Sequence, residues 1–161
     1  MKNVWLLSIV VVWTLAGCGV YSFKPSGESD YESLAIERLT NQTQEHELAD
    51  QITDLIIDAF IADGSMKVVA PSSADAVLRG VFKSYSREPL AYDETDQVQS
   101  YRVTMGFEIM LTNPADDSEI WKETFSQYGV YEVATETEED ARQRAIDRLI
   151  EQIIQKTTKS W

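Results

Sequence analysis

The chain has 161 residues, with 14 lysines and arginines against 27 aspartates and glutamates, which gives a formal net charge of −13. This acidic excess argues against non-specific binding to nucleic acid or to an anionic membrane surface, because both require clustered basic charge. One cysteine, Cys18, and one histidine, His46, cannot provide a disulfide or the usual nitrogen and sulfur ligands of a metal site.

The N-terminus has the pattern of a secretory signal that ends at a cysteine. Lys2 gives a positive start, residues 4–15 are mostly apolar, and Leu15-Ala16-Gly17-Cys18 follows. The apolar run is too short for a permanent span, which needs about 20 residues; an uncleaved N-terminal anchor is the alternative. The last four residues resemble the bacterial lipobox. That resemblance implies cleavage of a lipoprotein signal peptide, residues 1–17, a diacylglycerol thioether on Cys18, and N-acylation of the new terminus, typically with palmitate.

The predicted mature chain has 144 residues (161 minus 17) and a formal charge of −14, because Lys2 is lost with the signal. That length suits one domain. Residues 18–30 contain glycine, proline and serine without a regular period, which predicts a lipidated N-terminus and tether. Its apolar residues Val20, Tyr21 and Phe23 suggest docking on the domain or on the bilayer as an alternative to a plain extended leader. Residues 31–161 are predicted to form a single periplasmic domain.

The first half of this domain predicts a strand, a helix and a second strand. Residues 33–39 form the first strand and residues 40–43 a turn. Apolar residues then recur at helical spacing from Leu48 to Phe60, with Thr43 or Asn41 as the cap and Asp63-Gly64 as the stop. Residues 66–70 form the second strand, which ends before Pro71. This order is typical of a crossover unit between parallel strands.

The second half predicts three long strands and a second helix. Residues 77–87, 101–111 and 120–131 alternate between apolar and polar side chains, separated by an acidic loop at 88–96 and a turn at 113–118. Thr135 or Thr137 then caps a helix whose apolar stripe runs from Ala141 to Ile154. These elements predict an α+β two-layer sandwich, with two amphipathic helices on one face of a four- to five-stranded mixed sheet. The other sheet face is relatively bare.

The sequence offers little for catalysis. His46 stands alone in the polar first turn of a helix, and no set of base and nucleophile can be assembled around it. No glycine-rich phosphate loop is present, and the loop acids at 93–96 lack the pattern of a calcium loop. We therefore predict no catalytic residue, no metal and no cofactor.

One strand carries basic residues in an otherwise acidic chain. Strict alternation along residues 77–87 would place Arg79, Lys83, Tyr85 and Arg87 on a single face, to which neighbouring strands add Arg102 and Lys122. Such a set of cations and an aromatic ring can hold phosphorylated sugars or a protein surface. The alternative is an ordinary solvent-facing strand whose cations pair with Glu88, Glu108 or Glu123.

The whole mature chain resembles the LptE family of lipopolysaccharide-assembly lipoproteins. The residues that carry the resemblance are the lipobox with Gly19-Val20-Tyr21-Ser22-Phe23, Leu34-Ala35-Ile36, Asn41-Gln42-Thr43, Asp75-Ala76-Val77-Leu78-Arg79-Gly80, Ser84-Tyr85-Ser86-Arg87-Glu88-Pro89-Leu90-Ala91-Tyr92-Asp93 and Tyr101-Arg102-Val103. The resemblance implies a small, non-catalytic α/β domain, lipid-anchored in the periplasmic leaflet of the outer membrane. It implies that this domain plugs the large β-barrel LptD and helps it to assemble and to deliver lipopolysaccharide. Gly19 after the lipidated cysteine, where inner-membrane lipoproteins of enteric bacteria tend to have aspartate, agrees with that location.

The partners implied are therefore an LptD-like barrel, the membrane through the lipid anchor, and lipopolysaccharide itself. Contact with the glycolipid or the barrel is expected at Arg79, Lys83, Tyr85 and Arg87. Two rivals remain: a lipoprotein that activates or assembles another envelope complex, such as a cell-wall synthase or a secretion channel, and an enzyme.

Overall fold

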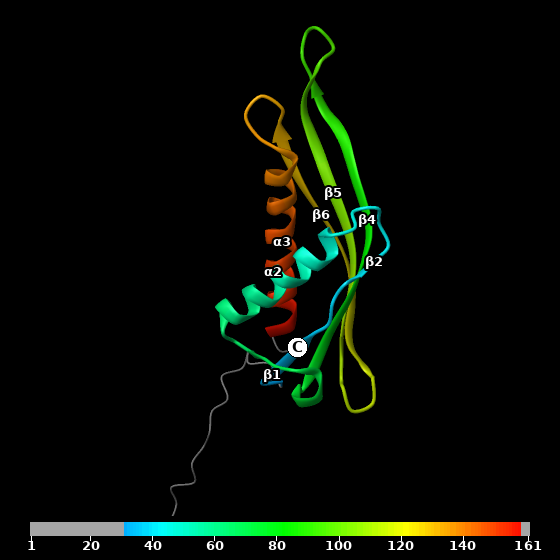
Figure 1. The fold of residues 1–161 in the computed structure, drawn as a ribbon, viewed down its shortest axis with the longest axis vertical. Coiled ribbons are helices and arrows are strands. Elements are labelled where there is room, and N and C mark those ends of the chain that lie inside the picture. The colour runs from blue at the N-terminus through cyan, green and yellow to red at the C-terminus, as the bar shows by residue number, and fades with distance from the viewer. Residues whose placement is uncertain (1–30, 159–161) are drawn as a thin grey trace, which may run out of the picture.

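The computed structural model describes residues 31–158; the predicted signal peptide, the predicted tether and residues 159–161 lie outside the described residues. Two helices pack against a mixed sheet of six strands (Figure 1). The elements are β1 (Ser33–Ile36), β2 (Thr40–Asn41), α2 (Leu48–Asp63), β3 (Lys67–Val68), the short 3-10 helix η1 (Pro71–Ser73), β4 (Ala76–Tyr92), β5 (Val98–Thr112), β6 (Glu119–Glu132) and α3 (Glu138–Thr158). The predicted α+β class is confirmed, and the strand count is one higher than the four to five predicted.

The sheet has a parallel part and an antiparallel part. The strand order is β3-β1-β4-β5-β6, and β2 pairs with β4 outside this path. β1 runs parallel to both β3 and β4, whereas β4, β5 and β6 form an antiparallel meander. The predicted strand–helix–strand unit is confirmed, because β1 and β3 are parallel neighbours joined through α2.

The first predicted strand is wrong in its extent. β1 ends at Ile36, and residues 40–41, predicted to be a turn, form the separate strand β2. The amide of Leu39 donates to the Thr53 hydroxyl of α2, at 3.1 Å, which interrupts the sheet pairing between the two strands. The chain then rejoins β4, where the Gln42 amide donates to the Phe82 carbonyl at 2.9 Å. A tertiary contact with α2 therefore divides what the sequence pattern presents as one strand.

Two of the three helix ends that the sequence predicts are confirmed. Gly64 ends α2 in the left-handed conformation, with φ of 70°, as glycine allows. α3 continues past the predicted apolar stripe to Thr158, and its start is capped by Thr137, whose hydroxyl accepts from the Asp140 amide at 3.3 Å. The predicted cap of α2 is wrong: Glu47 precedes the helix without a side-chain cap.

Asn41 and Thr43 instead fold the loop before α2. The Asn41 carboxamide oxygen accepts from the Thr43 amide at 2.8 Å, and its nitrogen donates to the Glu45 carbonyl, also at 2.8 Å. These bonds make a compact turn that directs the chain from β2 into α2.

The predicted acidic loop at 88–96 is also too long. β4 continues to Tyr92, where Glu88 pairs with Arg102 and Pro89 with Tyr101 of β5. Only the residues between Tyr92 and Val98 form the turn, which the Asp93 carboxylate closes by accepting from the Thr95 and Gln97 amides. The hairpin therefore extends beyond the N-terminal end of α3 (Figure 1).

Both helices cover the same face of the sheet, as predicted (Figure 1). Alternate residues of β5 point into this layer and are fully buried or nearly so, and both helices contribute their apolar stripes to the same core. The main members are Val103, Met105, Phe107, Ile109 and Leu111 of β5, Ile52, Ile56 and Phe60 of α2, and Ile146, Leu149 and Ile153 of α3. Burial of this apolar surface is the main source of stability for a domain without a disulfide.

α3 lies very close to β6 and covers its free edge. A side chain at Gly129 of β6 would overlap the backbone carbonyl of Ala141. Along the same edge, Arg144 and Arg148 of α3 donate to the carbonyls of Val130 and Tyr128, at 2.5 and 2.6 Å. These bonds satisfy main-chain groups that would otherwise be open to pairing with another chain.

We expect Gly129→Ala to lower the free energy of unfolding by more than about 2 kcal/mol, because its Cβ overlaps backbone atoms that cannot rotate away. Gly106→Ala is the matched control in the neighbouring strand. Its Cβ would meet the Ser84 hydroxyl, which can rotate, so we expect a loss below about 1 kcal/mol. Urea denaturation of both variants measures the difference, and equal losses would contradict the close packing of α3 on β6.

Candidate interaction surfaces

The basic strand predicted from the sequence contains a β-bulge at its centre. Phe82 pairs with Phe107 and Ser84 with Gly106, so two steps along β4 correspond to one step along β5. Lys83 is the additional residue between the two pairs. An additional residue reverses the side of the sheet to which every later side chain points.

The predicted single face is therefore wrong. Arg79 pairs with Met110, on the sheet face away from the helices, whereas Tyr85 and Arg87 pair with the buried Met105 and Val103, on the helix side. Whether these residues contact a glycolipid or a barrel stays a prediction. They do so, if at all, from two different sides of the molecule.

On the helix side, four residues form a hydrogen-bonded group that we call the Tyr85 cluster: Tyr85, Arg87, Glu138 and Arg142. The Tyr85 hydroxyl donates to one oxygen of Glu138, and Arg87 donates to the other at 3.0 Å. Arg142 donates to Glu138 at 2.8 Å and to the Tyr85 oxygen at 2.8 Å. The cluster joins the middle of β4 to the first turns of α3.

A fifth residue connects the cluster to the loop before α2, since a guanidinium nitrogen of Arg142 lies 3.5 Å from a carboxylate oxygen of Glu45. Arg87 also lies over the ring of Tyr101, 4.9 Å from its centre, and Tyr101 stacks on Tyr131 at 5.5 Å. The cluster therefore links both helices' N-terminal regions to three strands of the sheet.

The protonation states in the Tyr85 cluster suit its hydrogen bonds, which link the helices to the sheet. Burial, and then the hydrogen bond to Glu138, raises the pKa of Tyr85, so the phenol stays protonated and donates. Burial alone would raise the pKa of Glu138, but the hydrogen bonds from Tyr85, Arg142 and Arg87 together lower it. Burial likewise opposes the charge on Arg142, whose bonds to Tyr85 and Glu138 nevertheless raise its pKa. Glu138 is thus an ionised acceptor for three donors.

The opposite side of the sheet, which we call the open sheet face, carries separate ion pairs. Arg79 bridges Glu37 and Asp117, at 3.0 and 2.9 Å, and its pKa is raised by the bond to Asp117 and then by that to Glu37. Lys122 pairs with Glu108 at 3.0 Å. The hydrogen bond from Lys122 lowers the pKa of Glu108, to which the nearby charge of Lys83 contributes. The sequence alternative that these cations pair with neighbouring acids is confirmed for Glu108.

Tyr128 is a site residue that the sequence reading missed. It lies on the open sheet face with 48% of its surface exposed. The guanidinium groups of Arg102 and Arg148 lie over its ring, 5.1 and 5.2 Å from the centre. Alternation along β6 was the available signal, since Tyr128 is out of phase with the buried Trp121 and Phe125. Arg148 could not be found this way, because it reaches the ring from α3.

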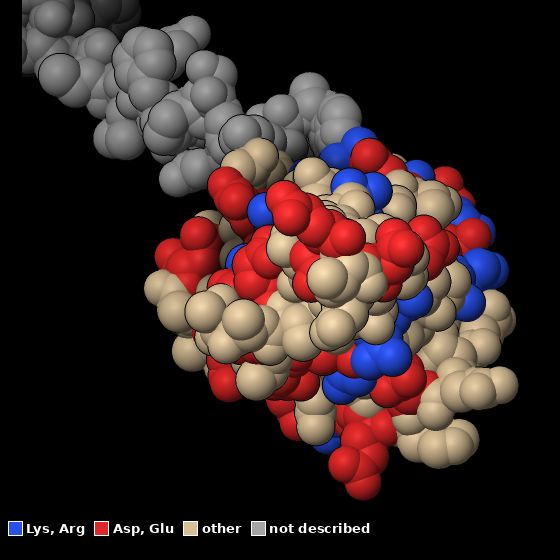
Figure 2. Space-filling model, turned by 90° about the horizontal axis from the view of Figure 1, so that it is seen from above, with Lys and Arg blue, Asp and Glu red and all other residues tan. Residues whose placement is uncertain are grey.

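Both signs of charge occur together on the face of the molecule that Figure 2 shows. Seen end-on, acidic side chains cover much of the visible surface and lysines and arginines lie among them (Figure 2). Within residues 31–158, no three histidines, cysteines or acids come together as metal ligands. No helix in that part of the chain is long and apolar enough to cross a membrane. The polar groups thus form exposed surfaces and structural bonds.

The described part of the chain is thus a small two-layer α+β domain with two charged surfaces that differ in character. The model of one protein family, LptE, described as lipopolysaccharide-assembly, matches residues 31–157. The chain belongs to the LptE lipopolysaccharide-assembly family.

Solved structures share the fold at low sequence identity. The chain is similar to a PelC dodecamer subunit from Paraburkholderia phytofirmans, with 14% identity, a TM-score of 0.58, and coverage of 84% of this chain and 92% of that one. Protein XCC0632 from Xanthomonas campestris is 12% identical, with a TM-score of 0.60. The match covers 83% of this chain and 88% of that protein. A minor lipoprotein from Acinetobacter baumannii is 15% identical, with a TM-score of 0.52. The match covers 81% of this chain and 97% of that lipoprotein. A comparison with curated proteins found no match.

We expect Glu138→Gln to destabilise the protein by about 1–3 kcal/mol at pH 7, because a neutral amide replaces the ionised acceptor of three donors. Glu139→Gln is the control, since the neighbouring carboxylate is 65% exposed and only approaches Arg142, at 3.6 Å. That variant should change the free energy of unfolding by less than about 0.5 kcal/mol. Similar effects of the two substitutions would contradict the role of the Tyr85 cluster.

The contribution of Glu138 should also depend on pH. Its pKa is lowered in the folded state, so its stabilising effect is complete above the pKa of an unperturbed glutamate, about 4.3. The effect is lost as the pH falls through the lowered folded-state pKa. The difference in unfolding free energy between the wild type and Glu138→Gln should therefore be constant near neutral pH and decrease below about pH 4. Urea denaturation across this range measures it, and a difference independent of pH would contradict the assignment.

Proposed function

We propose that this protein is an outer-membrane lipoprotein that sits in the lumen of an LptD-like β-barrel. It helps that barrel to assemble and to deliver lipopolysaccharide to the cell surface, without catalysis of its own. A lipid on Cys18 holds it in the periplasmic leaflet. The match of the LptE family model to residues 31–157 carries this proposal.

The character of the open sheet face supports it. The lumen of a large outer-membrane barrel is polar, so a domain that occupies it needs polar surfaces on sides that face the wall. The open sheet face has Arg79, Lys83, Arg102 and Lys122 interspersed with Glu37, Glu108 and Asp117. A face with both signs of charge can pair with either sign on a barrel wall.

The same face is the better candidate for contact with anionic glycolipid. Lys83 is exposed, and two guanidinium groups lie over the ring of Tyr128. Such a group of cations and an aromatic ring can bind a phosphate and pack against a sugar. Of the four residues predicted from the sequence, Arg79 and Lys83 belong to this face. Tyr85 and Arg87 lie on the helix side, where they bind Glu138, so we assign them a structural role first.

An affinity pull-down from detergent-solubilised outer membrane tests the barrel partner. We expect a large β-barrel protein to co-purify with the wild type. The double variant Lys83→Glu with Arg102→Glu should reduce its recovery several-fold, because both cations are exposed and reversing them disrupts the charge pattern of the open sheet face. Recovery of another envelope complex instead would support the rival assembly-factor function.

Arg87→Gln is the control for this experiment, because Arg87 lies on the helix side. It should leave barrel recovery and outer-membrane integrity unchanged. If the double variant also leaves both unchanged, the open sheet face is only a solvated surface.

Mass spectrometry of the mature protein tests the anchor. We expect a mature N-terminus at Cys18 that carries a diacylglycerol thioether and an amide-linked acyl chain, since three acyl chains suffice for stable attachment. Cys18→Ser should leave the signal uncleaved and move the protein out of the outer-membrane fraction. A mature chain that still begins at Met1 would contradict this part of the proposal.

A further inference from the structure

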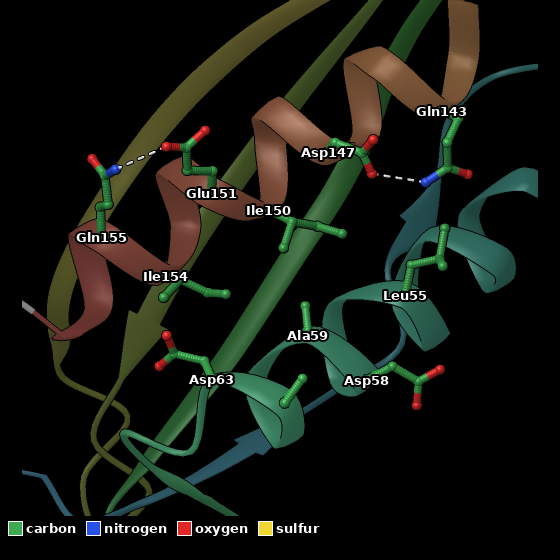
Figure 3. A pocket seen from close by; sticks show the side chains of 11 residues that line it. Leu55, Asp58, Ala59, Asp63, Gln143, Asp147, Ile150, Glu151, Ile154 and Gln155 are labelled. Carbon is green, nitrogen blue, oxygen red and sulfur yellow. Dashed lines mark hydrogen bonds between the residues drawn. The ribbon is translucent and has the colours of Figure 1, made fainter. Parts of the chain in front are cut away.

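The two helices leave an apolar groove between them, on the outer side of the helix layer (Figure 3). Its volume is about 670 Å³. Its apolar part consists of Leu55 and Ala59 of α2 and Ile150 and Ile154 of α3, all half-buried. A groove with such a floor can bind apolar side chains of another segment.

The charge around this groove is entirely acidic. Asp58 and Asp63 of α2 face Asp147 and Glu151 of α3 across it, and none of the eleven lining residues is basic. This excludes the phosphates of a glycolipid or an acidic phospholipid as occupants, because no cation is present to pair with them. The groove instead favours a segment that combines apolar side chains with a positive charge.

The chain itself enters the domain beside one end of the groove. The Lys67 amide donates to the Glu32 carbonyl at 3.0 Å, and Lys67 is only four residues after the groove residue Asp63. β1 begins near the C-terminal ends of both helices (Figure 1), where Ile154 and Asp63 also lie (Figure 3). The described part of the chain therefore begins next to this end of the groove.

The sequence before Tyr31 has the required composition. Val20, Tyr21 and Phe23 are apolar, and Lys24 follows directly. Pro25 and Gly27 then provide turn-forming residues for a change of direction.

The distances are also compatible with docking. The chain from Phe23 to Tyr31 can span about 26 Å when extended. The groove extends along α3 from Gln143 to Gln155, a rise of about 18 Å. Phe23 can therefore reach any part of it.

We propose that residues 20–24 bind in the groove between α2 and α3. Tyr21 and Phe23 pack on Leu55, Ala59, Ile150 and Ile154, and Lys24 pairs with the acidic rim. Because the segment is covalently attached, its effective concentration at the groove is high, on the order of millimolar, so even a weak contact is populated. If Cys18 is acylated as proposed above, this contact holds the helix side of the domain close to the membrane.

Photo-crosslinking of the full mature protein in detergent tests the contact. Phe23→p-benzoylphenylalanine keeps an aromatic ring at position 23 and reacts with neighbouring C–H bonds. We expect cross-links to peptides that contain Leu55, Ile150 or Ile154, identified by mass spectrometry. The same probe at Tyr92, which is 58% exposed at the far hairpin, should give no cross-link to these peptides.

Two groove variants complete the test. Ala59→Trp should abolish the cross-links by filling the groove, whereas Ile61→Trp, at a residue of α2 that is 62% exposed and outside the groove lining, should leave them unchanged. Lys24→Glu should lower the cross-linking yield about fivefold at low salt, because the acidic rim repels the new carboxylate. This second variant tests the contact even if Ala59→Trp fails to fold. Cross-links from position 23 to detergent, to lipid or to a co-purified protein, or a yield insensitive to Ala59→Trp and Lys24→Glu, would overturn the proposal. None of these outcomes depends on the barrel partner.

Discussion

The additional residue at Lys83 decides which side chains β4 presents to the helices. Side chains of a strand alternate with a period of two, so a single extra residue moves all later ones to the other side of the sheet. Before the bulge, β4 directs Leu78, Gly80 and Phe82 into the core. After it, Tyr85 and Arg87 occupy the helix side and meet Glu138 and Arg142 of α3. Without the bulge, Tyr85 and Arg87 would point to the open sheet face, and the ionised Glu138 would lack these two donors.

α3 is the element that holds the layers together, and it does so largely through arginines. Arg142 binds the Tyr85 cluster, whereas Arg144 and Arg148 donate to carbonyls on the free edge of β6. Gly129 allows the close approach of helix and strand that these bonds require. Much of the small complement of basic residues is thus engaged in bonds within the domain.

The two large surfaces have different chemistry. The open sheet face combines both signs of charge with the exposed Tyr128, whereas the groove between the helices combines an apolar floor with an acidic rim. An anionic ligand can therefore bind to the first and is repelled by the second, as Coulomb's law requires for an uncompensated cluster of carboxylates. The two surfaces therefore suit ligands of different chemistry.

The sequence by itself determined the element order, the α+β class, the core-facing residues of β5 and both helix stripes, because alternation and helical spacing are local patterns that burial enforces. The family was equally legible, since the resemblance depends on short motifs. Only the tertiary structure decided that Arg79 and Arg87 lie on opposite sides of the sheet. The bulge is a change in the pairing between β4 and β5, and the sequence of β4 alone does not show it. The tertiary structure also decided that Arg148 joins Arg102 at Tyr128, and that residues 33–41 form two strands. Those outcomes depend on contacts with α3 and α2, which are distant in the chain, and no local pattern records them.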